Sequence, residues 1–154
     1  MKSKRGMVCG MAVVAALAAA ECAYAALGGN ADTVTADRKA LSGVHRASTS
    51  RNGYTVEEIA SDSTTVREYV SSAGVVFGIA WNGYVHPDLT QLLGSYSGHY
   101  SSARKNAPHV QGRRNQRIAA DDVVVEKWGH MRNLQGRAYA PALVPSGVSI
   151  DEIK

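Results

Sequence analysis

The sequence predicts an α+β domain with one antiparallel sheet of about five strands, a meander plus a C-terminal hairpin, and one principal helix packed on it. Three observations support this fold class. Strand-like runs separated by short polar turns follow one another from Tyr54 to Trp81. A stripe of apolar residues at helical spacing begins after Pro87. Two further strand-like runs between Asp122 and Tyr139 predict the hairpin.

Residues 1–25 carry the pattern of a secretory signal peptide. Three cations precede the uninterrupted apolar run Met7–Ala20, and small residues at Ala23 and Ala25 suit signal peptidase, so we expect cleavage between Ala25 and Ala26. An apolar run of this length is shorter than the roughly twenty residues that a membrane-spanning helix needs. We therefore expect an exported chain, periplasmic or secreted after cleavage, with no transmembrane anchor in its mature part.

Cleavage would leave a single α+β domain at residues 26–154 and change its composition. The net charge would fall from +4 to +2, because three cations and one acid leave with the signal. Cys9 and Cys22 would also leave, and Glu21 directly before Cys22 fits a lipidation site badly. The mature chain is thus expected to be free of cysteine, with no disulfide, thiol nucleophile or cysteine metal ligand. Its stability must come from an apolar core.

The first part of the mature chain is polar. A short helix is expected at 32–41, capped by Asp32 or Thr33 and ended by Gly43. Ser48–Gly53 has the composition of a loop. Tyr54–Ala60 alternates imperfectly and suits an edge strand.

The middle of the chain holds the densest apolar pattern. Thr64–Val70 predicts a second strand and Val75–Trp81 a third. Val75–Trp81 places large side chains at odd-numbered positions and smaller ones at even-numbered positions, which is typical of a central strand. The large side chains are expected to fill the core on one face. Gly78 and Ala80 on the other face would let a helix or backbone come close.

The principal helix is expected to begin at Pro87, which suits a first helical position, with Asp88 favouring the positive helix end. Gly94 could end this helix, but the apolar stripe continues and favours extension to about Ala103. The basic stretch 104–120 lacks an apolar period and is interpreted as a surface loop.

The last third of the chain predicts a hairpin and an irregular end. Asp122–Trp128 and Arg132–Tyr139 form the two hairpin strands, with Gly129 between them. Two prolines follow, so regular structure is expected to stop. Ser149–Lys154 is interpreted as a frayed end.

No local motif predicts catalysis or a metal centre. The histidines are scattered and show no H-E-x-x-H spacing, so we expect no metal and no cofactor. The run Gly94–Gly98 resembles a nucleophile elbow, but Tyr96 stands where the serine must be. Arg67 and Glu68 are expected on opposite faces of their strand. No catalytic residue is therefore assigned.

Polar residues near the helix start and the hairpin are the candidate ligand-binding set: His86, Asp88, His130, Arg132, Arg137 and Tyr139. Two interpretations of the hairpin stay open. Its arginines, histidine and tyrosine could line a polar pocket. Alternatively, its glycines allow a turn and a bulge while arginine stems cover the sheet.

The cations of the stretch 104–120 are a second candidate feature. They could contact an anionic surface. Nucleic acid is not expected as a partner, because no aromatic residue is interleaved among these cations to stack on bases.

Several segments in order resemble a known family. They are ALGG at 26–29, TTVREYVSSAGVVFGIAW at 64–81, PDLTQLLGSY at 87–96 and GHMRNLQGRAYAPALVPSGVS at 129–149. The chain resembles the domain of unknown function 2844 family, which comprises small exported bacterial proteins. This resemblance implies a single exported domain and transfers no activity, cofactor or catalytic residue.

Two functional expectations follow. The first is a non-catalytic binding or structural module of the cell envelope, whose partner could be an envelope protein or an anionic surface. The alternative is a small periplasmic hydrolase or other enzyme that uses a spatially assembled site of His130, Arg132 and Asp88. A deep pocket joining these side chains would favour the alternative.

Overall fold

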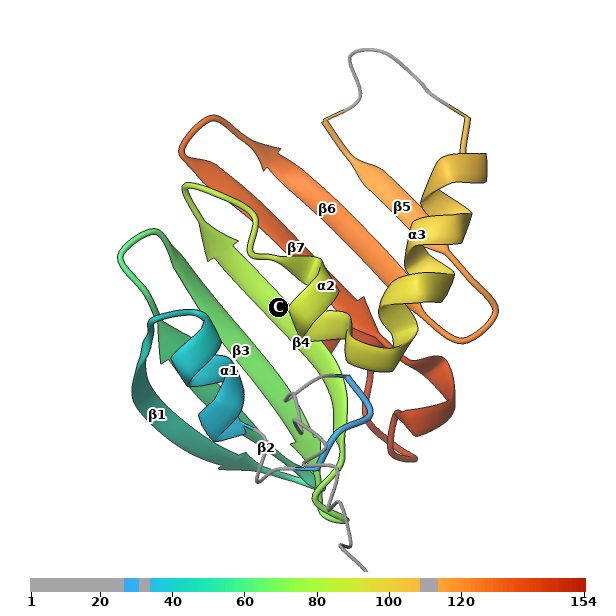
Figure 1. Cartoon of the computed structure of the whole chain (residues 1–154). Helices are drawn as coiled ribbons and strands as arrows, with labels where there is room; N and C mark the ends of the chain where they lie inside the picture. The colour runs from blue at the N-terminus through green and yellow to red at the C-terminus, as the bar shows by residue number, and fades with distance from the viewer. Residues whose placement is uncertain (1–26, 31–33, 109–113) are drawn as a thin grey trace, which may run out of the picture.

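The computed structural model describes residues 27–30, 34–108 and 114–154 (Figure 1). The predicted signal peptide at 1–25, with its cleavage site, lies outside these residues. The predicted helix caps Asp32 and Thr33 also lie outside them.

One antiparallel sheet forms the centre of the domain, which confirms the α+β class, the meander and the C-terminal hairpin. The sheet has seven strands rather than about five, in the order β1-β2-β3-β4-β7-β6-β5. Their bounds are β1 Val44–Arg51, β2 Tyr54–Ala60, β3 Thr64–Ser71, β4 Val76–Gly83, β5 Gln116–Ala119, β6 Val124–His130 and β7 Asn133–Tyr139. The meander β1–β4 and the group β5–β7 join where β7 pairs with β4.

The two strands that the sequence analysis missed are the edges of the sheet. β1 occupies most of the segment interpreted as loop Ser48–Gly53, and β5 lies inside the predicted surface loop 104–120. Tyr54–Ala60 is consequently an inner strand, since β1 covers its outer side. Every residue of β1 is exposed, so no side chain needs to be apolar there. An edge strand of this kind leaves no alternating pattern in the sequence.

Helices cover one face of the sheet (Figure 1). They are α1 at Val34–Ala40, α2 at Leu89–Leu93, the 3₁₀ turn η2 at Gly94–Tyr96, and α3 at Ser97–Asn106. The principal helix thus continues past Gly94 as predicted, although Gly94 has φ +50° and separates α2 from α3. The predicted short N-terminal helix is present as α1, and the Gly43 amide closes its end by donating to the Arg38 carbonyl.

The helix-side core packs the apolar residues of α2 against the central strands. Leu92 and Leu93 contact a cluster that includes Ile79 and Trp81 and reaches Tyr100 of α3. A Cβ atom built on Gly136 would lie 2.3 Å from the Trp81 ring, so only glycine allows this indole to lie flat on β7. The helix-side core therefore lies over the paired strands β4 and β7.

The opposite face carries its own core of aromatic residues. Tyr54, Tyr69 and Phe77 contact one another, with ring centroids 5.8–6.2 Å apart. A bulge shifts the β3–β4 register, so that Tyr69 faces Gly78 while Val70 faces Val76. Phe77 therefore lies on this face, and the prediction that it shares one face with Ile79 and Trp81 is wrong.

The C-terminal segment, defined as Pro141–Lys154, covers part of this second face. It contains two 3₁₀ turns, η3 at Pro141–Leu143 and η4 at Ile150–Glu152. Ser149 and Glu152 form a capping box around η4, and Ile153 is fully buried. A Cβ atom on Gly78 would lie 2.8 Å from the Ile153 side chain, so this glycine admits it. The prediction of a frayed end is wrong, because a buried anchor holds these residues.

Replacement of Ile153 tests how much this anchor contributes. Ile153→Ala is expected to lower the free energy of unfolding by about 2–5 kcal/mol, since it removes a fully buried side chain and leaves a cavity. Urea denaturation of the mature chain measures the change. Ile150→Ala removes the same atoms from a half-buried position of the same segment and should cost clearly less. Equal, negligible losses in both variants would contradict the docking of the segment.

Candidate functional site

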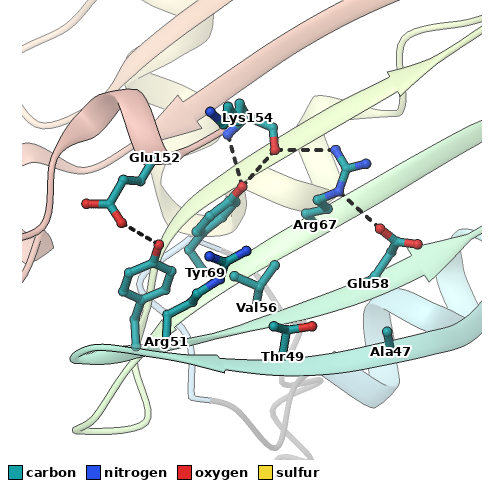
Figure 2. Close-up of a pocket in the computed structure, with 10 residues that line it drawn as sticks. Ala47, Thr49, Arg51, Val56, Glu58, Arg67, Tyr69, Glu152 and Lys154 are labelled. Atoms are coloured by element: carbon teal, nitrogen blue, oxygen red, sulfur yellow. Dashed lines mark hydrogen bonds and ion pairs between the residues drawn. The ribbon is translucent and has the colours of Figure 1, made fainter.

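A groove of about 380 Å³ lies where the C-terminal segment stops covering the second face. Strands β1, β2 and β3 form its floor, and the end of the C-terminal segment forms one wall (Figure 2). We call it the C-terminal groove. Its lining residues are Ala47, Thr49, Arg51, Tyr54, Val56, Glu58, Arg67, Tyr69, Glu152 and Lys154.

Hydrogen bonds from β3 fix the wall of the groove at Lys154. The Tyr69 hydroxyl donates to the Lys154 carbonyl at 2.8 Å and accepts from the Lys154 amide at 2.9 Å. Arg67 donates from Nη1 to the same carbonyl at 3.3 Å (Figure 2). Burial raises the pKa of the Tyr69 phenol, which keeps it protonated and able to donate. The wall is therefore held in one position without a regular element.

A second contact holds the wall at Glu152. The Tyr54 hydroxyl donates to Glu152 Oε2 at 2.7 Å, and the Ser149 amide donates to Oε1 at 3.0 Å. Burial raises the pKa of Tyr54 to about 12, and the hydrogen bond to Glu152 and its charge add to the shift. The same hydrogen bond from Tyr54 is the main cause that lowers the pKa of Glu152. Glu152 is therefore ionised and already engaged.

The charges that remain available in the groove are positive. Glu58 accepts from Arg67 Nε at 3.0 Å, so this acid is paired within the floor. Arg51 makes no ion pair with any described residue. It extends from β1 towards Tyr69 in Figure 2. Its positive charge partly offsets the rise that burial causes in the pKa of Tyr54 and Tyr69. The arrangement suits a ligand that carries negative charge.

Two of the sequence-predicted site residues, His86 and Asp88, lie around the start of α2 and have structural partners. His86 Nδ1 accepts from the Trp81 indole at 2.9 Å. Burial lowers the pKa of His86, and the nearby Lys127 lowers it further, so the ring is neutral at pH 7. Asp88 caps α2 by accepting from the Thr90 amide at 2.9 Å. Neither residue lines the C-terminal groove.

Arg137 and Tyr139 lie on the face that the C-terminal segment covers. Arg137 pairs with Glu126 at 2.6 Å and donates to the Ile150 carbonyl at 2.9 Å. Its aliphatic stem and guanidinium therefore tie η4 to the sheet. Tyr139 is buried in the aromatic core. Glu126 also accepts from Arg117 at 3.0 Å. A hydrogen bond with Tyr139, followed by this contact with Glu126, raises the pKa of Arg117.

His130 and Arg132 lie at the exposed β6–β7 turn, where Arg132 has φ +66°. The six predicted residues are thus divided among the start of α2, the face covered by the C-terminal segment, and this turn. The structure brings Arg137 and Tyr139 onto one face and does not join them to His86 or Asp88 by any contact among the described residues. A role in ligand binding stays a prediction for each.

Sequence analysis missed the residues of the C-terminal groove. One signal was present, because Tyr54, Val56 and Glu58 alternate onto one face of their strand. The expectation that Arg67 and Glu68 point to opposite faces is confirmed. Arg67 lines the groove, while Glu68 is fully buried in register beside Ile79 of the helix-side core. No sequence pattern indicated that the end of the chain would return to this face.

Metal-ligand groups and membrane-spanning helices are both absent from the described ranges 27–30, 34–108 and 114–154. No group of three or more histidine, cysteine or acidic residues is arranged there to hold a metal ion. No helix in these ranges combines the length and hydropathy required to cross a membrane.

The fold and the groove define a class: a small α+β domain whose antiparallel sheet is covered by helices on one face and half covered by its own C-terminal segment on the other. Within this class, the chain belongs to the family described as protein of unknown function (DUF2844), whose model matches residues 23–153. No curated protein and no solved structure matches the chain.

The burial of Tyr54 and its contact with Glu152 predict a distinctive alkaline titration. Because the folded pKa of Tyr54 is about 12, against 10.0 ordinarily, its stabilising contribution is present below pH 10 and is lost as pH rises towards 12. Burial also raises the pKa of Tyr69, so ultraviolet titration of the folded chain should show a late phenolate change to which both tyrosines contribute. Tyr54→Phe should reduce this change, whereas Tyr84→Phe, which removes an exposed phenol outside the groove, should leave it in place. An unreduced late change in Tyr54→Phe would contradict the environment described for Tyr54.

The same contact predicts that the free energy of unfolding falls at acid pH, a range that we call the acid limb. Since the pKa of Glu152 is lowered, its contribution is present above its ordinary value of 4.5 and is lost as pH falls through the folded value. Glu152→Gln should flatten the fall in unfolding free energy over this range, measured by urea denaturation at several pH values. Asp151→Asn is the matched control, because Asp151 is exposed and makes only a 3.6 Å contact with Arg137. An unchanged acid limb in Glu152→Gln would contradict the account.

Proposed function

We propose that this chain is an exported, non-catalytic module of the bacterial cell envelope that binds a partner in the C-terminal groove. One observation carries the proposal: the C-terminal segment covers only part of the second sheet face and leaves a charged groove over β1–β3. A sheet face of a small domain is normally covered or solvated by a regular polar pattern. Here a half-covered face is combined with a wall fixed at Tyr54, Arg67 and Tyr69.

The groove has the features of a preorganised binding site. Its tyrosine hydroxyls and both of its acids are engaged within the domain. Arg51 stays without an ion pair to the described residues and faces the open floor of Thr49 and Val56. A cation placed beside small side chains can accept an anionic group without breaking an existing pair.

Export is supported by the sequence that precedes residue 26. The positive and apolar segments before that point have the order of an export signal.

The enzymatic alternative has weaker support. His86 is engaged with Trp81 and Asp88 with the Thr90 amide, whereas His130 and Arg132 lie at an exposed turn. A general acid or base needs reach to a shared substrate position, and no described pocket is lined by these residues together. Binding therefore accounts for more of the geometry than catalysis does.

Native mass spectrometry of the chain recovered from the envelope of an expressing bacterium tests the proposal. We expect the mass of residues 26–154 together with a bound partner, and we expect Thr49→Trp, which fills the groove, to abolish the added mass. Ser102→Trp places the same bulk on an exposed position of α3 and should leave the complex intact. Full-length chain in the cytoplasm would contradict export. A bare monomer, or added mass that Thr49→Trp does not change, would contradict binding in the groove.

A further inference from the structure

Strand β1, which forms one side of the C-terminal groove, is also the long open edge of the sheet. Among the described residues it pairs with β2 alone, and all eight of its own residues are exposed. The other edge strand, β5, has only four residues. An open edge presents unpaired backbone groups that can receive another strand, and proteins block such edges with proline, short strands, bulges or charged side chains. β1 has no proline and is eight residues long, and its bulge lies at its start, so the regular part from Ala47 to Arg51 stays open.

The register shows which backbone groups point outward. A turn of two residues, Asn52 and Gly53, joins β1 to β2, so the flanking pair Arg51–Tyr54 exchanges both of its backbone hydrogen bonds. Along a strand of an antiparallel pair, the backbone N–H and C=O groups of one residue bond the neighbouring strand, and those of the next residue point away from it. Ser48 and Ser50 therefore turn their amide and carbonyl groups away from β2. The bulge near His45 lies before this regular part and leaves it undisturbed.

The charge of β1 indicates what kind of strand would fit. β1 contains no acidic residue. Arg46 and Arg51 make no ion pair with the described residues, while the nearby acid Glu57 is already bound by His45 and Ser48 at 2.6 Å each. An added strand with acidic side chains would therefore meet unpaired cations. Two copies of β1 placed edge to edge would instead gather four arginines, which disfavours self-pairing.

The groove gives such a strand room for its side chains. Ala47 and Thr49 lie on the floor beside Arg51, and successive side chains of an added strand alternate between the two sheet faces. Every second side chain of the added strand would thus project beside small residues towards the groove. A carboxylate there can reach Arg51, while the backbone bonds the outward groups of Ser48 and Ser50.

We propose that β1 receives an extended acidic segment of a partner protein as an eighth strand of the sheet. Main-chain hydrogen bonds at Ser48 and Ser50 supply part of the affinity, and Arg46 and Arg51 select for acidic side chains. This inference rests on the proposed function and names the partner class of the same site.

A synthetic peptide as long as β1, in which threonine alternates with glutamate, is the probe. Its affinity for the chain 26–154 is measured by fluorescence anisotropy, and amide hydrogen exchange is followed by NMR in the same samples. We expect saturable binding, a loss of about tenfold or more when lysine replaces glutamate, and slowed exchange at the amides of Ser48 and Ser50. Exchange at the inward amide of Thr49 should change less, because β2 already bonds it.

Two pairs of variants separate backbone pairing from charge. Ser50→Pro removes an outward amide and should weaken binding about tenfold, whereas Ser50→Ala keeps that amide and should bind as the parent does. Arg51→Glu should weaken binding of the glutamate peptide and strengthen binding of the lysine peptide. Arg104→Glu on α3 alters net charge equally, at a distant position, and should do neither. If Ser50→Pro fails to fold, exchange at Ser48 and Ser50 in the parent chain still decides the matter.

Failure of this inference is distinguishable from failure of the proposed function. Binding that leaves the Ser48 and Ser50 amides fast would overturn strand addition and keep the groove as a site. Concentration-dependent protection of these amides without peptide would assign the edge to a second copy and would also overturn the inference. No binding of the acidic peptide would overturn it as well, while a partner mass that Thr49→Trp abolishes would leave the proposed function standing.

Discussion

The docking of the C-terminal segment on the sheet is the constraint on which the rest of the structure depends. Without it, the aromatic residues Tyr54, Tyr69 and Phe77 would lie on an uncovered face. Ile153 fills the space that Gly78 leaves open, and burial of one such side chain is favourable by about 2–3 kcal/mol. The polar contacts around Ile153 then determine the path of the C-terminal segment across the sheet as well as adding stability. The sheet thus lies between the helices on one face and the largely irregular C-terminal segment on the other.

The same docking creates the groove and determines its charge. The C-terminal segment crosses β7, β4 and β3, and Lys154 lies beside Tyr69. The second face of β2 and β1 is therefore left open. Several contacts that fix the C-terminal segment engage an acid or a carbonyl: Tyr54 with Glu152, and Tyr69 and Arg67 with the Lys154 carbonyl. Within the sheet, Arg67 also pairs with Glu58. Within the part of the chain that the structure describes, Arg46 and Arg51 of β1 have no such ion-pair partner. Structural pairing therefore produces a surface that is locally positive although the domain is close to neutral.

The elements predicted from sequence were those whose side chains face a core. Val76–Trp81 is buried along its length, and Leu89, Leu92 and Leu93 form the buried side of α2. Burial of this kind imposes the apolar patterns that predict a strand or a helix. Every residue of β1 is exposed and Ile118 is the one buried residue of β5, so the pairing of these strands leaves no such pattern in the sequence. The end of the C-terminal segment was predicted wrongly for a related reason. Its apolar residues show no regular period, and the partners of Glu152 and Lys154, Tyr54 and Tyr69, lie 98 and 85 positions away in the chain.

The candidate site could not be assembled from sequence because its floor and its wall come together only in the fold. The bulge that places Phe77 on the second face also leaves no pattern in the sequence. NMR cross-relaxation between the Ile153 methyl groups and the Gly78 α-protons tests the central claim most directly. The account predicts strong cross-peaks, together with a slowly exchanging Lys154 amide held by the Tyr69 hydroxyl. Absent cross-peaks with random-coil shifts across Ser149–Lys154 would contradict it, and the groove would then have no wall.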